Sequence, residues 1–309
     1  MGYINDAVPP FLLDGGGKIW HSPIEDHLVG FSNLCVHLFV FISGYGLAYT
    51  SRQSLLDQIK RMGKLYKAFI PIFLLSSLLL YFFFDKQINA KEFVLNAICI
   101  SHSYNNHWWF IPMYFALLLL FPLLKKTIAF PVITLISLLF IKILGKFSLS
   151  EFDVYTGYGV YECFMCVLSA LTGYMVVFYM GLVCAKDTTV SIVFNKYFEK
   201  IRTNKLWSII VLFLAIVIAD IVPYFGFLAF ILVPIVIPAM LNITKGNVVR
   251  YLGDLSMYIW LSHYFLFKLI KDFLNSLGNF YIVFPTFIHL CIMLALVFKR
   301  LIRFDKSYI

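Results

Sequence analysis

The chain has 309 residues, of which 61% are hydrophobic and only 13% are charged. About a quarter of the residues of an ordinary soluble domain are charged, so this composition excludes a soluble globular protein and favours a helical membrane protein. The net charge of +9 lies in short basic clusters between apolar runs. This placement is typical of cytoplasmic loops and argues against nucleic acid as a partner.

The N-terminal residues 1–30 contain three consecutive glycines and lack the basic start and apolar stretch of a signal peptide, so we predict an extracytoplasmic loop-like segment. Residues 31–50 follow without a single Asp, Glu, Lys or Arg and are long enough to cross a membrane. They contain His37 and a predicted break at Ser43-Gly44. A polar break in a membrane helix needs protein or a water-filled cavity beside it, so this helix is expected to line a site.

Apolar run lengths and basic flanks predict one membrane domain over residues 31–309, with about nine transmembrane helices. The long apolar run from Leu206 to Asn242 is divided into two helices because Pro223 can turn the chain. The expected helices are 31–50, 66–84, 109–124, 128–145, 167–185, 206–222, 224–242, 255–274 and 281–299.

Most of the Lys and Arg residues lie in alternate connections and in the C-terminal tail. The positive-inside rule makes these connections cytoplasmic, so the C-terminus is expected in the cytoplasm and the N-terminus outside. An outside N-terminus without a signal sequence leaves two interpretations. Either the first helix inserts with its N-terminus outward, or, as we favour, a preceding helix is absent from this chain.

Two basic stretches, 54–67 and 190–205, have the mixed pattern of helices that lie at the lipid headgroups. Ordinary basic loops are the favoured interpretation of both, and the first stretch is alternatively a candidate contact for an anionic ligand from the cytosol. Cys163 and Cys166 form one CxxC pair without a second pair nearby, so we predict no metal site and leave the role of the pair open.

Four segments in this order carry a resemblance to a known family: FVFISGYGLAY, QIKRMGKLYKAFIP, NHWWFIPMYFALLLLFPLL and YLGDLSMYIWLSHYFLF, at residues 39–49, 58–71, 106–124 and 251–267. Together they resemble the acyltransferase 3 family of integral-membrane acyltransferases. The family normally begins with a helix that carries an Arg, ten residues and a His. Neither His21 nor His27 has a basic residue eleven positions before it, so the chain is expected to be truncated or to lack that base.

The resemblance implies a multi-pass protein of a bacterial inner or plasma membrane that O-acetylates a cell-envelope polysaccharide or glycan precursor. Acyl-CoA, with acetyl-CoA expected, would be the donor substrate from the cytosol, and no tightly bound cofactor is expected. Membrane lipid, the glycan acceptor and acyl-CoA are thus the expected partners. Such a reaction needs a base, an oxyanion stabiliser and cations for the CoA phosphates.

The candidate catalytic residues are two histidines, because an imidazole titrates near working pH. His263 lies mid-helix in the fourth segment, and an ionisable group at membrane depth is a functional candidate. His37 is the second candidate. For each, a structural or interfacial histidine is the alternative, whereas packing is the favoured interpretation of His289.

The candidate substrate-binding residues are polar or aromatic side chains beside these histidines: Ser43, Gly44, His107, Trp108, Trp109 and Ser256. Trp108 and Trp109 are expected either to stack on sugar rings or to anchor a helix at the membrane interface. Arg61, Lys64 and Lys67 are the candidate acyl-CoA-binding residues, with a purely topological role as the alternative.

Other classes of polytopic membrane protein fit the composition as well. A transporter would show repeats of broken helices, which we do not find, and a glycan polymerase or flippase would have a larger outer loop. A catalytically inactive relative of the family is the remaining alternative.

Overall fold

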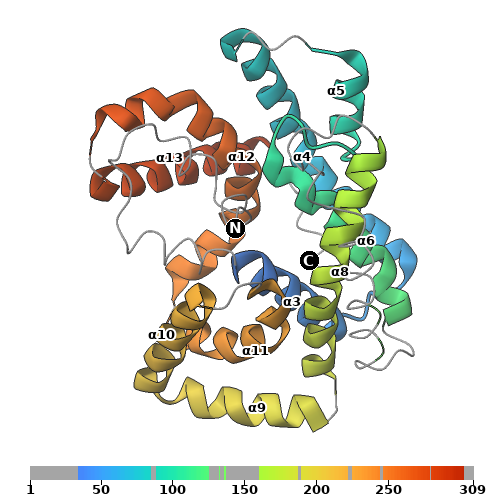
Figure 1. The fold of residues 1–309 in the computed structure, drawn as a ribbon, viewed down its shortest axis with the longest axis vertical. Coiled ribbons are helices and arrows are strands. Elements are labelled where there is room, and N and C mark those ends of the chain that lie inside the picture. The colour runs from blue at the N-terminus through green and yellow to red at the C-terminus, as the bar shows by residue number, and fades with distance from the viewer. Residues whose placement is uncertain are drawn as a thin grey trace. The chain divides into compact units, whose positions relative to one another are not determined.

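The computed structural model describes residues 34–84, 88–124, 132, 136, 160–186, 189–221, 225–243, 246–278 and 280–302. All regular structure within these ranges is helical, which confirms the all-α class (Figure 1). The predicted segment 1–30 and almost all of the predicted helix 128–145 lie outside them. The helices are α3 (Leu34–Tyr49), α4 (Leu55–Phe84), α5 (Ala90–Ala97), the short η3 (Asn106–Trp109), α6 (Phe110–Leu124), α8 (Val160–Ala185), α9 (Thr189–Arg202), α10 (Lys205–Ile221), α11 (Phe225–Ile243), α12 (Asn247–Ser276) and α13 (Phe280–Leu301).

Three stretches of the described helices are long and apolar enough to cross a membrane: Leu55–Phe83, His107–Leu124 and Tyr281–Leu301. A fourth exists if α8 and α9 form one broken span, and α3, α10 and α11 contain shorter apolar stretches. These lengths support a helical membrane protein. The nine crossings and the outside N-terminus stay predictions.

Helix α4 joins two elements that the sequence predicts as separate. The basic stretch 54–67, for which an ordinary loop was favoured, and the predicted membrane helix 66–84 form one helix of 30 residues, about 45 Å long, so the predicted start near residue 66 was wrong. The helix begins with reciprocal hydrogen bonds between Ser54 and Asp57, which resemble a capping box. Phe69 and Phe73, on either side of Pro71, are fully buried in the core. Their packing stabilises the helix where Pro71 removes a backbone hydrogen bond.

The basic stretch after α8 forms the helix α9 over most of residues 190–205, so the favoured interpretation of this stretch as an ordinary loop was wrong. The axes of the paired segments Ala170–Ala185 and Val190–Ile201 differ by 81°, and Figure 1 shows the sharp corner between α8 and α9. Asn242 of α11 donates hydrogen bonds to the Ile201 carbonyl (3.0 Å) and to Ser208 Oγ (2.9 Å). Helices α9, α10 and α11 are therefore tied together at one end.

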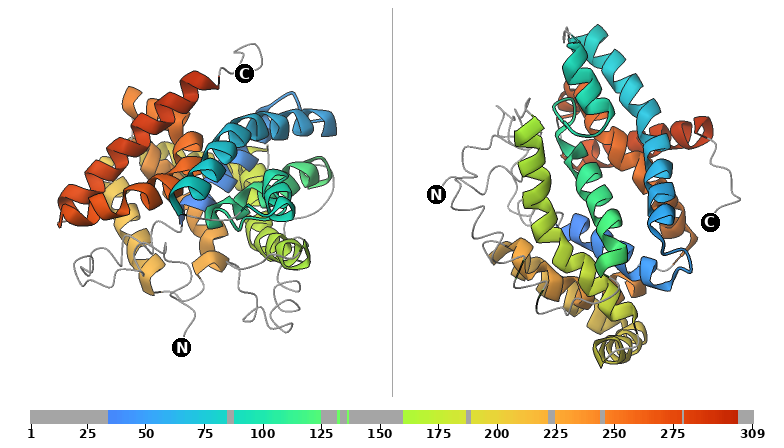
Figure 2. Two further views of the ribbon diagram at one scale, coloured as in Figure 1. Left: turned by 90° about the horizontal axis from the view of Figure 1, so that it is seen from above. Right: turned by 90° about the vertical axis from the view of Figure 1, so that its right-hand side faces the viewer.

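The chain divides into two compact units. Unit 1 comprises residues 1–53, 120–143 and 172–245, and unit 2 comprises residues 54–119, 144–171 and 246–309. The core of unit 2 is rich in aromatic rings from α4, η3 and α12. Helices α12 and α13 of unit 2 lie side by side along their length (Figure 1; Figure 2, left).

Candidate active site

Two of the predicted site histidines meet in unit 2. His263 lies in α12 and His107 in η3, and their ring centroids are 4.9 Å apart at an interplanar angle of 49°. Both side chains are partly buried. The sequence separates these residues by more than 150 positions, so only the packing of η3 against α12 brings the two imidazoles together.

The hydrogen bonds of His263 determine which ring nitrogen is basic. Its Nδ1 lies 2.8 Å from the Trp260 carbonyl oxygen and 3.2 Å from that of Ile259. Carbonyl oxygens only accept hydrogen bonds, so Nδ1 carries the proton and donates it. In the neutral ring, Nε2 then holds the lone pair, which is the arrangement of a general base.

The segment before α6 fixes His107. The Asn105 side chain caps η3, because its Oδ1 accepts a hydrogen bond of 2.9 Å from the His107 backbone N–H. Asn105 is fully buried, and its Nδ2 has no hydrogen-bond partner among the described residues. A buried donor of this kind calls for a water or ligand acceptor. Asn105 precedes the predicted residues His107, Trp108 and Trp109 but was not among the predicted substrate-binding residues.

Trp108 locks η3 onto α12. The indole N–H donates a hydrogen bond of 3.2 Å to the Leu261 carbonyl, and the ring lies edge-on to Phe69 at 4.8 Å. The side chain is only 2% exposed, so both ring faces are covered in this structure. Its neighbour Trp109 is partly buried, with its ring centroid 6.0 Å from that of Phe110.

An aromatic and a basic side chain flank the histidine pair and were not predicted. The Tyr264 ring stands edge-on to His107 at 5.3 Å. The Lys268 ammonium lies 4.7 Å from the centroid of the Tyr264 ring, one turn along α12. Tyr264 and Lys268 lie on α12 with His263, whereas His107 comes from η3. The spacing of Tyr264 and Lys268 is visible in the sequence, but their proximity to His107 depends on the packing of η3 against α12.

The loop between α5 and η3 is held by hydrogen bonds to polar side chains of α5. Asn96 donates to Ser103 Oγ (2.9 Å) and accepts from the Tyr104 backbone N–H (3.2 Å), while Ser103 donates to Glu92 (2.6 Å). Burial, with a smaller contribution from Glu92, raises the pKa of Tyr104 to about 12, so its hydroxyl stays protonated near neutral pH. Burial also raises the pKa of the Cys99 thiol to about 12.

Ser256 precedes His263 by seven residues, or about two turns, so the two share one side of α12. Ser256 is exposed, and its Oγ donates to the Gly253 carbonyl at 2.7 Å. On this side of α12, Ser256 and His263 each form a hydrogen bond to a backbone carbonyl of their own helix.

The remaining predicted substrate and catalytic residues lie in unit 1. His37 is buried, with its ring centroid 4.7 Å from that of Tyr174. Ser43 is partly buried. The predicted break at Ser43-Gly44 is wrong, because α3 is continuous from Leu34 to Tyr49.

Gly44 serves close packing of two helices instead. A Cβ at Gly44 would overlap the Phe178 carbonyl of α8, and a Cβ at Gly181 of α8 would overlap the Phe41 carbonyl of α3. The two backbones touch through paired glycines, as small residues allow in membrane helices.

The candidate CoA-binding cations lie on α4. Arg61 and Lys64, and then Lys64 and Lys67, are three residues apart, so consecutive members of this set are neighbours on the helix surface. Lys64 and Lys67 are exposed, and Arg61 is partly buried. Among the described residues, no three His, Cys, Asp or Glu side chains lie together as metal ligands. The side chains of the predicted Cys163 and Cys166 pair lie outside the described ones.

The comparisons with known proteins address the family. The acyltransferase domain family matches residues 7–298 and so spans all four segments that carry the resemblance. No curated protein and no solved structure matches the chain. Because the match covers nearly the whole sequence, the chain belongs to the acyltransferase 3 family of membrane acyltransferases.

Proposed function

We propose that the protein transfers an acetyl group from cytosolic acetyl-CoA to a hydroxyl group of a cell-envelope polysaccharide or glycan precursor. Membership of the family supports acyl transfer in general. The single observation that supports a base-catalysed transfer is the orientation of the His263 ring by backbone hydrogen bonds. Its Nδ1–H is held by two backbone carbonyls, so Nε2 can accept a proton from an acceptor hydroxyl.

The reaction balances without a cofactor. Nε2 of His263 removes the hydroxyl proton while the hydroxyl oxygen attacks the thioester carbonyl carbon and forms the new C–O bond. The tetrahedral intermediate collapses with cleavage of the C–S bond, and the CoA thiolate leaves. The imidazolium of His263 returns its proton to the thiolate, so the products are the acetyl ester and CoA.

The other candidates would act around this step. His107, adjacent to His263, would orient the acceptor hydroxyl, together with Trp109 and Ser256 on the acceptor side. Arg61, Lys64 and Lys67 would contact the CoA phosphates, since phosphate binding favours clustered cations. His37, with Ser43 and Gly44, stays the alternative catalytic position.

The test uses membrane vesicles that contain the full chain, radiolabelled acetyl-CoA and a crude glycan fraction as acceptor. His263→Asn keeps a side-chain N–H for the backbone carbonyls but has no basic nitrogen, so we expect a loss of about 10²–10⁴-fold in acetyl transfer. His289, for which packing was predicted, is instead exposed on α13, so His289→Asn is the matched control and should retain transfer.

Equal rates for both variants, each present in the membrane at the wild-type level, would reject His263 as the base. A wild-type chain that transfers no label to any glycan fraction would reject the enzyme proposal and favour the inactive-relative interpretation.

A further inference from the structure

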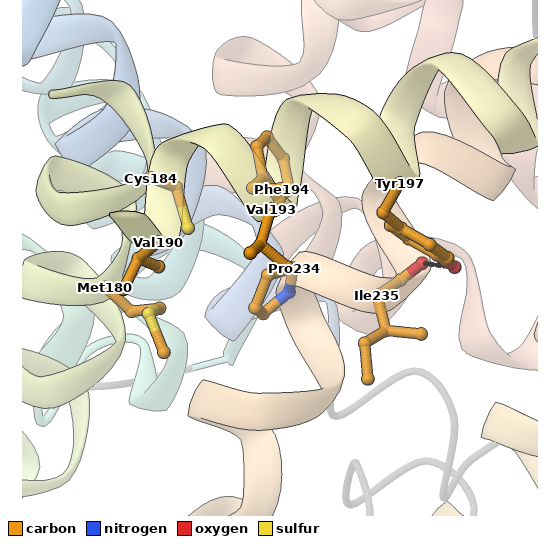
Figure 3. A pocket seen from close by; sticks show the side chains of 8 residues that line it. All are labelled: Met180, Cys184, Val190, Val193, Phe194, Tyr197, Pro234 and Ile235. Atoms are coloured by element: carbon orange, nitrogen blue, oxygen red, sulfur yellow. Dashed lines mark hydrogen bonds between the residues drawn. The ribbon is translucent and has the colours of Figure 1, made fainter. Parts of the chain in front are cut away.

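A pocket in unit 1 shares no residue with the histidine pair and has no role in the proposed reaction. Figure 3 shows Val193 and Phe194 of α9 above Pro234 and Ile235 of α11, with Met180 and Cys184 of α8 closing one end. The pocket is open on one side, has a volume of about 340 Å³, and its walls are almost entirely apolar. The Tyr197 hydroxyl, at the other end, donates its hydrogen bond to the Ile235 carbonyl at 2.9 Å.

The helix above the pocket carries positive charge on one flank. Val190, Val193, Phe194 and Tyr197 form the pocket side of α9 at helical spacing. Lys196 and Lys200 follow Val193 by three and seven residues, so they project on the Val193 side of this stripe. Both lysines are exposed, and neither forms an ion pair with a described residue. Basic charge therefore borders an apolar cavity.

We propose that this pocket binds an anionic glycerophospholipid of the surrounding membrane, with one acyl chain in the cavity and the phosphate beside Lys196 and Lys200. An almost wholly apolar wall suits a hydrocarbon chain and offers no partner for a polar headgroup. Lysines at the lipid surface attract anionic lipids. The sharp angle between α8 and α9 suits a helix that lies in the headgroup plane beside a crossing helix.

The acetyl donor is a poorer occupant. An acetyl group has only two carbon atoms and does not need a cavity of this size. The binding of lipid here also does not depend on the proposed acetyl transfer, so the two proposals are tested separately.

The experiment reconstitutes the full chain in phosphatidylcholine vesicles that contain a small fraction of phosphatidylglycerol with a photoreactive diazirine in one acyl chain. After irradiation, the labelled peptides are identified by mass spectrometry. We expect label on the peptides that contain Met180, Cys184 and Pro234. Val193 lines the pocket and Ile192 does not, although both are similarly exposed, at 63% and 62%. Val193→Trp places a large ring at the pocket and should lower this label strongly, whereas Ile192→Trp should retain it.

The role of the two lysines beside the lipid phosphate is tested by separate variants. Lys196→Ala and Lys200→Ala should each lower the ratio of phosphatidylglycerol to phosphatidylcholine labelling by up to about fivefold. Lys205→Ala, a change of an exposed lysine at the start of α10, is the matched control and should not change the ratio.

Three outcomes would overturn the proposal. Equal labelling of the Val193→Trp and Ile192→Trp variants would show that the acyl chain does not enter the pocket. Equal labelling by diazirine analogues of phosphatidylglycerol and phosphatidylcholine in the wild type would remove the role of the lysines. Preferential labelling by a long-chain diazirine acyl-CoA would assign the pocket to an acyl donor.

Discussion

Two helix contacts in this protein use opposite solutions. In unit 1, α3 and α8 touch backbone to backbone through Gly44 and Gly181. In unit 2, α4, η3 and α12 meet through large rings centred on Trp108. The first contact needs the absence of side chains, and the second depends on their bulk.

The difference bears on where chemistry can occur. Glycine contacts bring main chains together and leave no polar side chain at the point of contact. The aromatic contact has an indole N–H that requires a partner, and it holds η3 so that His107 lies beside His263. Unit 1 also has a histidine beside an aromatic ring, His37 with Tyr174, which allows a direct comparison.

The largest expected effect separates the two histidine positions. His37→Phe keeps a ring against Tyr174 and should leave most of the acetyl transfer. His263→Phe removes the basic nitrogen and should lower transfer by about 10²–10⁴-fold. The measurement is the initial rate at saturating acetyl-CoA in vesicles with matched protein content. The reverse ranking would move the proposed base to unit 1.

The second effect tests the aromatic contact by stability. Trp108→Ala removes a buried ring and should destabilise the fold by about 3–5 kcal/mol, measured as thermal unfolding in detergent. Trp207→Ala, at a 48% exposed position, should stay within about 0.5 kcal/mol of the wild type. Similar losses for both variants would mean that Trp108 does not organise the core of unit 2.

The third effect tests the glycine contact with two positions of one helix. Gly44→Ala places a methyl group against the Phe178 carbonyl and should destabilise the fold by about 1–3 kcal/mol. Gly46→Ala meets nothing within 4 Å and should be neutral or stabilising by up to about 1 kcal/mol. Thermal unfolding of the pair provides the comparison, and a stabilising Gly44→Ala would contradict the close contact.

The smallest effect concerns an ion pair of unit 2. Lys299 Nζ lies 3.6 Å from Asp254, but the two side chains are 40% and 64% exposed. Lys299→Ala should therefore cost less than about 1 kcal/mol, and the difference from wild type should shrink in high salt. A large loss that shrinks in high salt would show instead that this ion pair contributes substantially to joining α12 to α13.

The sequence allowed the helices to be located but not their partners. Apolar run length predicted α10, α11 and α13 to within a few residues because the signal is local. The same signal placed the start of α4 after its basic stretch. The continuous helix depends on the burial of Phe69 and Phe73, which is a tertiary effect.

The site shows the same limit. His107 and His263 were each predicted from local pattern, whereas their contact depends on Trp108, for which the sequence suggested interfacial or sugar-stacking roles. Gly44 was recognised as unusual and assigned to a break, because only the opposing Gly181 reveals a close contact.

The two prolines inside α11 have a mechanical consequence. Pro234 and Pro238 have no N–H, so two of the hydrogen bonds that would stiffen this helix cannot form. A helix that lacks two backbone hydrogen bonds, at prolines four residues apart, bends there at a lower free-energy cost than a helix without such prolines. Because Pro234 lines the apolar pocket, bending of α11 at this residue would change the shape of that pocket.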